Sequence, residues 1–212
     1  MTSDSKRGRA HDVTRVAVLL FDACDLIDVA GPVAVWLTAN RLAERSGDRA
    51  PFEVLTVSDG GTPVTAYGGL GLTPQAALED LDAVDVFVVP GAIDIDGVLS
   101  EPRLIDLVRD RADRDRVMVS VCTGAFVLAA AGVLEGRPFT THFEDVDALT
   151  ARVTAGEPRP AVRWVDQGDV VTSGGMTSGI AMALHLVERV AGPALAEATA
   201  EQIDYTWTEQ RV

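Results

Sequence analysis

The sequence predicts an α/β fold in which helices cover both faces of a mainly parallel central sheet. Continuous β-branched and aliphatic runs, typical of strands buried on both faces, recur along the chain. Segments with apolar residues at helical spacing lie between these runs, and such alternation favours parallel pairing through helical crossovers. The 212 residues are enough for one domain with a sizeable core. We therefore expect a three-layer α/β/α sandwich.

The first half of the chain supplies three strands and one long helix of this sandwich. Residues 15–21, RVAVLLF, predict a buried strand that is followed by a loop at 22–31. Pro32 then suits the first position of a helix, because its missing N–H has no intrahelical partner there. The remaining elements of this half are a strand at 52–58, a β-ribbon within the Gly- and Thr-rich segment 60–74, and a buried strand at 84–89.

The second half continues the alternation of strands and helices. An amphipathic helix at 101–114 precedes a buried strand at 117–121, and a small-residue helix at 123–131 follows that strand almost without a loop. The Arg- and Asp-rich stretch at 109–116 is interpreted as a solvated helix face and its exit. Further elements are expected at 139–141, 144–151, 162–173 (two strands), 177–190 and 193–205.

Composition limits the class of protein. The formal net charge of −14 disfavours binding to nucleic acid or to anionic membranes. Two cysteines cannot form a disulfide scaffold, and three scattered histidines form no metal-binding cluster with them, so we expect no metal and a reducing, cytoplasmic location. The apolar run at 125–134 is too short for a membrane span. Residues 1–13, which include His11, are expected to be a disordered tail, and residues 14–212 a single α/β domain.

Cys122 occupies the junction at which chemistry is most expected. It lies between a buried strand and the start of a helix, beside free backbone N–H groups and the positive end of the helix dipole. This placement favours the thiolate and predicts a cysteine version of the nucleophile elbow, for which Gly124 and Ala125 are suitably small. The alternative is that Cys122 is a buried small hydrophobe, which is common for a free cysteine.

Three separated motifs around this junction occur in a recognisable order. They are LLFDACDLIDVAGP at 19–32, VCTGAFVLAAAGVLEGRPFTTH at 121–142 and VVTSGGMTSGIAMALHLVE at 170–188. Together they resemble the ThiJ/PfpI superfamily, the cysteine-centred relatives of class I glutamine amidotransferases. Within it the chain is most similar to isocyanide hydratases and to the sensor domains of AraC-type regulators. The resemblance implies a flavodoxin-like sandwich, a nucleophilic cysteine, no cofactor and a homodimer.

The resemblance also assigns roles to individual residues. It makes Cys122 the nucleophile and Asp28 its acidic partner, which could remain protonated beside a thiolate and deliver a proton. Thr123 is expected to offer its backbone N–H to charge that develops on the substrate, as are Gly91 and Ala92 on the loop after the third strand. Relatives usually have a second glycine at the position of Ala92, so the wall of the site departs from the pattern here.

Several of these residues also have a purely structural interpretation. Asp28 could simply cap the helix that follows it, and Thr123 could cap its own helix. His142 is either a pocket-lining residue or a surface histidine, while His185 and Cys24 are expected to be structural. Relatives with amidase or protease activity commonly carry histidine where this chain has Thr123, so a Cys–His dyad and proteolysis are not expected. Residues 174–179, GGMTSG, predict a strand-to-helix turn close to the pocket.

Two classes of function follow from the resemblance. The first is a cofactor-independent hydratase (a hydro-lyase) that converts an isocyanide and water to an N-formamide through a covalent Cys122 thioimidate. A related variant is a glyoxalase-like enzyme that acts on 2-oxoaldehydes. The second is a ligand or redox sensor domain like that of AraC-type regulators but without the DNA-binding region. We expect no such region, because the α/β domain occupies the chain up to Val212 and the net charge is negative. We favour an enzyme with a small-molecule substrate.

Overall fold

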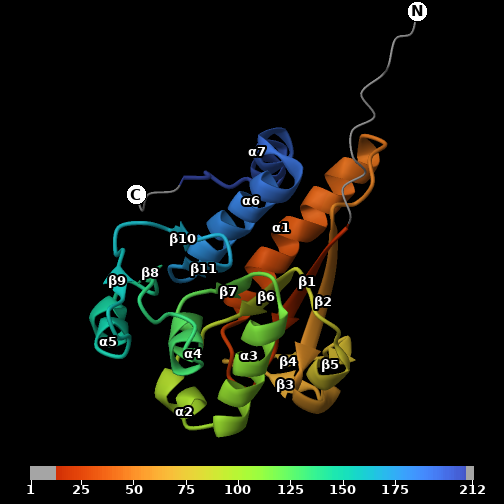
Figure 1. Cartoon of the computed structure of the whole chain (residues 1–212). Helices are drawn as coiled ribbons and strands as arrows, with labels where there is room; N and C mark the ends of the chain where they lie inside the picture. Colours follow the sequence, from red (N-terminus) through yellow and green to blue (C-terminus); the bar gives the residue numbers. More distant parts are fainter. Residues whose placement is uncertain (1–12, 209–212) are drawn as a thin grey trace, which may run out of the picture.

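The computed structural model of the chain describes residues 13–208, so residues 1–12 of the expected tail, with His11, lie outside it. A seven-stranded sheet in the order β10-β11-β7-β6-β1-β2-β5 forms the centre (Figure 1). All neighbouring strands run parallel except the antiparallel pair β10 and β11. The strands are β1 (Thr14–Leu19), β2 (Phe52–Ser58), β5 (Ala76–Ala77), β6 (Val86–Val89), β7 (Met118–Ser120), β10 (Trp164–Asp166) and β11 (Val170–Ser173). The predicted α/β fold with a mainly parallel sheet is confirmed.

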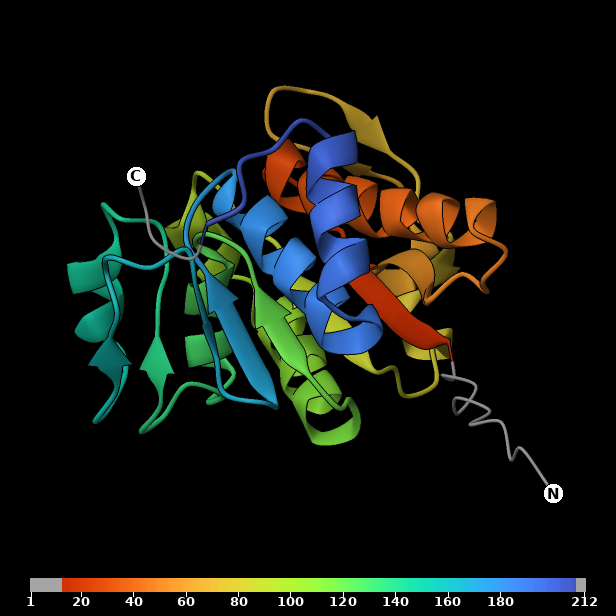
Figure 2. The same cartoon turned by 90° about the horizontal axis from the view of Figure 1, so that it is seen from above.

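Helices cover both faces of this sheet (Figure 2). One layer consists of α1 (Leu26–Arg45), α6 (Ser178–Ala191) and α7 (Pro193–Gln202), which pack against one another. The other contains α2 (Ile95–Leu99), α3 (Pro102–Arg114) and α4 (Gly124–Ala130), which also contact one another. The helix α5 (Val146–Thr150) and the small parallel pair β8 (Pro138–Phe139) and β9 (Glu157–Pro158) lie beside the β10–β11 end of the sheet.

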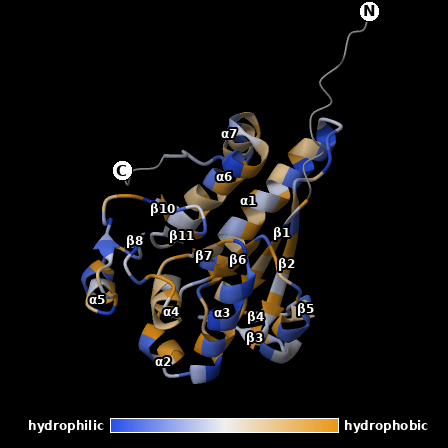
Figure 3. Cartoon of the chain, in the orientation of Figure 1, coloured by the Kyte–Doolittle hydropathy of each residue, from blue (hydrophilic) through white to orange (hydrophobic). Residues whose placement is uncertain are grey.

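The central strands carry the apolar runs of the sequence. Residues 16–19 of β1 are fully buried, as are most residues of β6 and β7, because a helical layer covers each face. Figure 3 shows this division, with hydrophobic colour on the strands and hydrophilic colour along α3. Each fully buried Val or Leu side chain contributes roughly 1.5–3 kcal/mol relative to exposure, so these strands hold the active-site edge rigid. The expected β-ribbon is the antiparallel pair β3 (Val64–Thr65) and β4 (Gly71–Leu72).

The first long helix begins earlier than Pro32. Asp25 is the N-cap residue of α1, and its side chain accepts the N–H of Ile27 at 3.0 Å. Pro32 therefore lies inside the helix, where its missing N–H removes only the bond to the carbonyl of Asp28. The expected loop at 22–31 is thus wrong beyond Asp25, because two start signals compete and the Asp cap is the one used. As a result, Asp28 projects from the first turn of a helix.

The Arg- and Asp-rich stretch is only partly a solvated face. Arg111 is 2% exposed and forms a bidentate ion pair with Asp115, at 2.6 and 2.7 Å. Its guanidinium also donates to the carbonyls of Leu81 and Asp82, both at 2.9 Å. Arg111 and Asp115 therefore fasten the end of α3 to the segment before β6, which contradicts the expectation of a wholly solvated run.

Several short elements have no clear signal in the sequence. They are β5, β9, α2 and the 3₁₀ turns η1 (Asp59–Gly61) and η2 (Leu78–Asp80). Such short pieces are fixed by the strands and loops around them. Among residues 13–208, the structure contains no helix that is both long enough and apolar enough to cross a bilayer.

Candidate active site

Cys122 lies in a sharp turn between β7 and α4, as the sequence predicts. Its φ is +56°, a left-handed conformation that costs a residue with a side chain about 1–2 kcal/mol. Three contacts hold this backbone in place. The Cys122 N–H lies 3.2 Å from the carbonyl oxygens of both Ser173 and Gly174, and the Cys122 carbonyl accepts the hydroxyl of Thr141 at 2.8 Å. The elbow is thus fixed by β11 and by the segment after β8.

Two glycines allow the elements of the site to approach one another closely. A Cβ atom on Gly124 would collide with the carbonyl oxygen of Val89, so only glycine lets α4 begin directly against the end of β6. A Cβ atom on Gly91 would lie 2.6 Å from Thr123 Oγ1 and 2.8 Å from Asp28 Oδ2. The absence of a side chain at Gly91 therefore creates the space in which the threonine and the carboxyl group lie.

Asp28 is a fully buried carboxyl group beside the Cys122 thiol. Its Oδ2 accepts the N–H of Gly91 at 3.1 Å, while Oδ1 has no hydrogen-bond donor in the described part of the chain. Burial, with a smaller contribution from Asp25, raises the pKa of Asp28 from 3.8 to about 7. The N–H groups of Gly91 and Met176 and the Cys122 thiol oppose this rise only in part. Asp28 can therefore both accept and donate a proton near neutral pH.

Cys122 is a neutral thiol in this arrangement. The residue is 8% exposed, and burial, followed by the charge of Asp28, raises the pKa of its thiol to about 12. The backbone N–H groups of Thr123 and Met176 face the sulfur and lower the pKa by less. The expected thiolate-favouring environment is thus wrong for the resting site, because α4 is a short helix whose dipole cannot offset burial beside a carboxylate. The thiol and the carboxyl group instead form a pair that can exchange a proton.

Thr123, Gly91 and Ala92 lie together at the site, but two of their N–H groups already have partners. The Gly91 N–H binds Asp28, and the Ala92 N–H binds Thr123 Oγ1 at 2.9 Å. The Thr123 hydroxyl in turn donates to the carbonyl of Ala92 at 2.8 Å. The hydroxyl therefore ties the 90–92 loop to the elbow, and the expected role of Gly91 and Ala92 as donors to a substrate remains a prediction.

The turn at 174–177 contributes a backbone donor that the sequence did not reveal. Met176 has a φ of +54°, and its N–H faces both Asp28 and Cys122. His142 packs against this turn, since a Cβ atom on Gly175 would collide with the imidazole ring. The Nδ1 atom of His142 lies 3.3 Å from a carboxylate oxygen of Asp145. His142 thus supports the wall of the site, whereas Met176 and Thr141 emerge only from backbone geometry.

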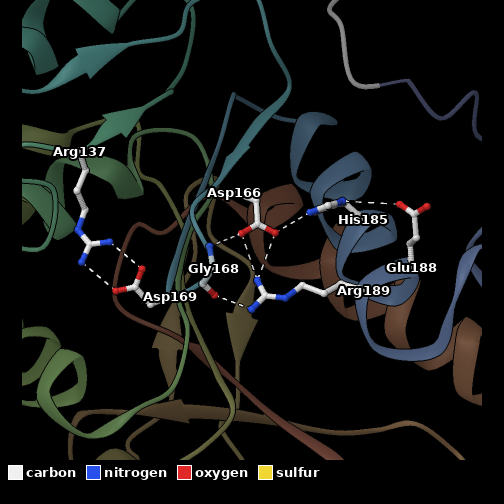
Figure 4. A network of polar contacts seen from close by, with 7 residues as sticks. All are labelled: Arg137, Asp166, Gly168, Asp169, His185, Glu188 and Arg189. Atoms are coloured by element: carbon white, nitrogen blue, oxygen red, sulfur yellow. Dashed lines mark hydrogen bonds and ion pairs between the residues drawn. The ribbon is translucent and has the colours of Figure 1, made fainter.

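The other thiol and histidine have structural surroundings. Cys24 is fully buried and pairs with Ala92 in an isolated antiparallel bridge. Nε2 of His185 lies 2.7 Å from Asp166, and its ring stacks on Trp164 at a centroid distance of 5.2 Å. Figure 4 shows Asp166 between His185 and Arg189, a network that fastens β10 to α6. Cys24 and His185 therefore have structural surroundings, as expected.

Three exposed apolar side chains lie in segments next to the elbow. Ile93, Phe143 and Met176 are 61%, 53% and 45% exposed, and each adjoins or belongs to a segment that contacts the elbow. A cavity of about 560 Å³ lies elsewhere, between the segment after β1, the 59–64 segment and the α2–α3 region, and Cys122 is not among its lining residues. Within residues 13–208, no group of three or more His, Cys, Asp or Glu side chains is arranged to hold a metal ion.

Most of the chain is similar in sequence to known proteins. A family model described as the DJ-1/PfpI family matches residues 14–189. Isonitrile hydratase from Pseudomonas putida is 32% identical over 191 residues, which cover 90% of this chain and 78% of that protein. The HTH-type transcriptional regulator CdhR from Pseudomonas aeruginosa is 36% identical over 184 residues, 86% of this chain. The chain covers 51% of this regulator, about half of its length.

A solved regulator structure has a similar fold. An AraC family transcriptional regulator from Pseudomonas putida matches with a TM-score of 0.77 and 26% identity, and the match covers 90% of this chain and 99% of the solved one. The relatives therefore include both a hydratase and regulators, and the resemblance seen in the three sequence motifs is confirmed. The chain belongs to the DJ-1/PfpI family.

Proposed function

We propose that the protein is a cofactor-independent isonitrile hydratase that uses Cys122 as nucleophile and Asp28 as proton carrier. The observation that carries the proposal is the buried pair of the Cys122 thiol and a carboxyl group whose pKa is raised to about 7. The 32% identity to isonitrile hydratase over 90% of the chain supports the choice of reaction. The exposed apolar side chains of Ile93, Phe143 and Met176, in segments next to the elbow, are compatible with a substrate that carries an apolar substituent.

The first chemical step joins the sulfur to the substrate. The ionised Asp28 carboxylate takes the thiol proton as the sulfur attacks the terminal isonitrile carbon, which forms a C–S bond. Asp28 then delivers this proton to the same carbon and becomes a carboxylate again. The product is a thioimidate, in which the former isonitrile carbon carries one hydrogen and the Cys122 sulfur. No free thiolate has to exist at rest, which is consistent with the raised pKa of Cys122.

Water completes the reaction. Its oxygen adds to the thioimidate carbon, while one water proton passes through Asp28 to the nitrogen. The tetrahedral intermediate then expels sulfur, and the hydroxyl proton returns to the thiol as the formamide carbonyl forms. The N–H groups of Thr123 and Met176, which face the sulfur, stabilise negative charge as the C–S bond breaks. The sum is one isonitrile plus one water to one N-formamide.

A set of four proteins tests the proposal. Wild type, Cys122→Ala, Asp28→Asn and the matched control Cys24→Ala are incubated with an aryl isonitrile and, separately, with methylglyoxal. We expect formamide from wild type and Cys24→Ala, and losses of at least about 100-fold in Cys122→Ala and Asp28→Asn, a typical effect of proton transfer alone. Formamide production that is equally fast in Cys122→Ala contradicts the mechanism. Lactate in place of formamide would identify the glyoxalase-like variant.

A second candidate is a ligand or redox sensor. The similarity to the regulator CdhR over 86% of the chain favours this candidate. The raised pKa of Cys122 opposes its redox version, because less thiolate is present to be oxidised. Mild peroxide followed by mass spectrometry of the Cys122 peptide tests the redox version, which fails if Cys122 resists oxidation. We further propose, on the family resemblance and the charge of −14, a cytoplasmic homodimer that acts on a small molecule without metal or nucleic acid.

A further inference from the structure

The segment after α7 lies close to the turn that carries Met176. This C-terminal strap, residues 203–208, leaves α7 and crosses α6 towards β10 (Figure 2). The indole N–H of Trp207 donates to the carbonyl of Ala181 in α6 at 3.0 Å, and its ring stacks on Trp164 of β10 at a centroid distance of 6.4 Å. The hydroxyl of Tyr205 donates to the carbonyl of Thr177 at 2.9 Å. The strap therefore contacts both the framework and the active-site turn, residues 174–177.

Arg163 links the same strap to the other end of this turn. Its carbonyl accepts the N–H of Gly174 at 2.8 Å, its guanidinium lies 5.6 Å from the centre of the Tyr205 ring, and its Nη1 donates to the Tyr205 hydroxyl. Burial raises the pKa of Tyr205, so the hydroxyl keeps the proton that it donates to Thr177. Arg163 itself adjoins β10, which the Asp166 network holds against α6 (Figure 4).

The active-site turn requires such support because its backbone is strained. Met176 adopts a left-handed conformation with a φ of +54°, and a conformation of this kind persists only where its surroundings enforce it. The inner side of the turn is held by the Cys122 N–H on the Gly174 carbonyl. The outer side is held by Arg163 and Tyr205 at its two ends. The direction of the Met176 N–H depends on both sides.

We propose that Tyr205 is a positioning residue, whose hydroxyl fixes the active-site turn so that the Met176 N–H stays directed at the Cys122–Asp28 pair. Tyr205 touches neither Cys122 nor Asp28 in any contact described above and acts through the backbone of the turn. The proposal rests on the assigned roles of Cys122 and Asp28, but its test requires no substrate turnover.

The test compares Tyr205→Phe with Trp207→Phe. The first removes the hydroxyl, and with it the bond to Thr177 and the bond from Arg163, and keeps the ring beneath Arg163. The second removes one hydrogen bond of the same strap that ends on Ala181 and leaves the turn untouched. The rate of alkylation of Cys122 by iodoacetamide is followed from pH 5 to 9 by mass spectrometry of its own peptide, which separates it from Cys24. Amide hydrogen exchange of the segment 173–180 is measured in parallel.

Loss of a directed N–H should raise the pKa of the carboxyl that it stabilises. Two or three backbone donors together lower a carboxyl pKa by about two units, so we expect the inflection near pH 7 to move upward by about half a pH unit in Tyr205→Phe. We also expect faster exchange in segment 173–180 for this variant, and neither change in Trp207→Phe.

The proposal is overturned if Tyr205→Phe leaves the inflection unchanged or lowers it, or if Trp207→Phe shifts it equally. The proposal is also overturned if Asp28→Asn keeps the inflection near pH 7 in the pH dependence of Cys122 alkylation, because the inflection then does not come from Asp28. If the wild type does not hydrate isonitriles but Tyr205→Phe still moves the inflection upward, the proposed reaction is refuted and the role of Tyr205 stands.

Discussion

Asp28→Asn should make the protein more stable relative to the wild type as the pH rises from 5 to 8. The pKa of this buried carboxyl rises from 3.8 to about 7 on folding. Between these values the folded protein holds the Asp28 proton while the unfolded chain has released it, so the stability of the wild type falls as pH rises and levels off above about pH 8. The whole effect is at most about 4 kcal/mol, and more than half of it develops between pH 5 and pH 8.

Urea unfolding of both proteins at pH 5, 6, 7 and 8 measures this difference. Asparagine retains an oxygen that can accept the Gly91 N–H, so the variant loses the titration and keeps the contact. Other groups cancel in the comparison between the two proteins. Leu37→Asn, at an exposed position of the same helix, introduces an amide without changing a titratable group, so it serves as control and should give a difference that is constant with pH. A constant difference for Asp28→Asn would refute the reasoning and return Asp28 to an ordinary carboxylate.

Three further substitutions test the framework of the site, each by urea unfolding. Gly91→Ala should destabilise the protein by at least about 2 kcal/mol, because its Cβ would meet Thr123 Oγ1 at 2.6 Å, and a neutral result would mean that the 90–92 loop moves freely. Arg111→Ala should cost about 3–5 kcal/mol, since it leaves the buried Asp115 carboxylate without its partner, and a loss below about 1 kcal/mol would show that water reaches the pair. Cys122→Gly should be more stable than Cys122→Ala by about 1 kcal/mol, because glycine tolerates the φ of +56°, and the reverse order would contradict strain at the elbow.

The elements that the sequence predicted best are those with an uninterrupted apolar run. The strand at 52–58 is found with the expected bounds, and the Cys122 elbow lies where a strand run meets a small-residue helix. The start of α1 was misplaced because Asp25 and Pro32 are both start signals, and propensity alone does not rank them. The buried state of Arg111 depends on carbonyl groups of Leu81 and Asp82, far away in the sequence, so its charge pattern resembled a solvated face.

The electrostatics of the site were less predictable than its location. The sequence indicates a helix start beside Cys122, but the extent of burial and the position of the Asp28 carboxyl decide the pKa of the thiol. A helix terminus contributes about 0.3–1 kcal/mol, whereas burial beside a like charge shifts pKa values by several units. The Met176 N–H carries no side-chain signature, and the Tyr205 hydroxyl, from the far end of the chain, binds the carbonyl of the next residue, Thr177. These contributions depend on tertiary structure that a local pattern does not contain.

Because Asp28 lies in the first turn of α1, a helix of the core and not a connecting segment sets its position. Asp28 and Cys122 are both carried by elements anchored in the core, α1 and the β7–α4 junction, so their separation is set by the packing of the two helical layers against the sheet. Ile93 and Phe143, by contrast, belong to connecting segments that can change in length or sequence without displacing the pair. Substitutions in these connecting segments can therefore change the surroundings of the pair while the separation of Asp28 and Cys122 stays the same.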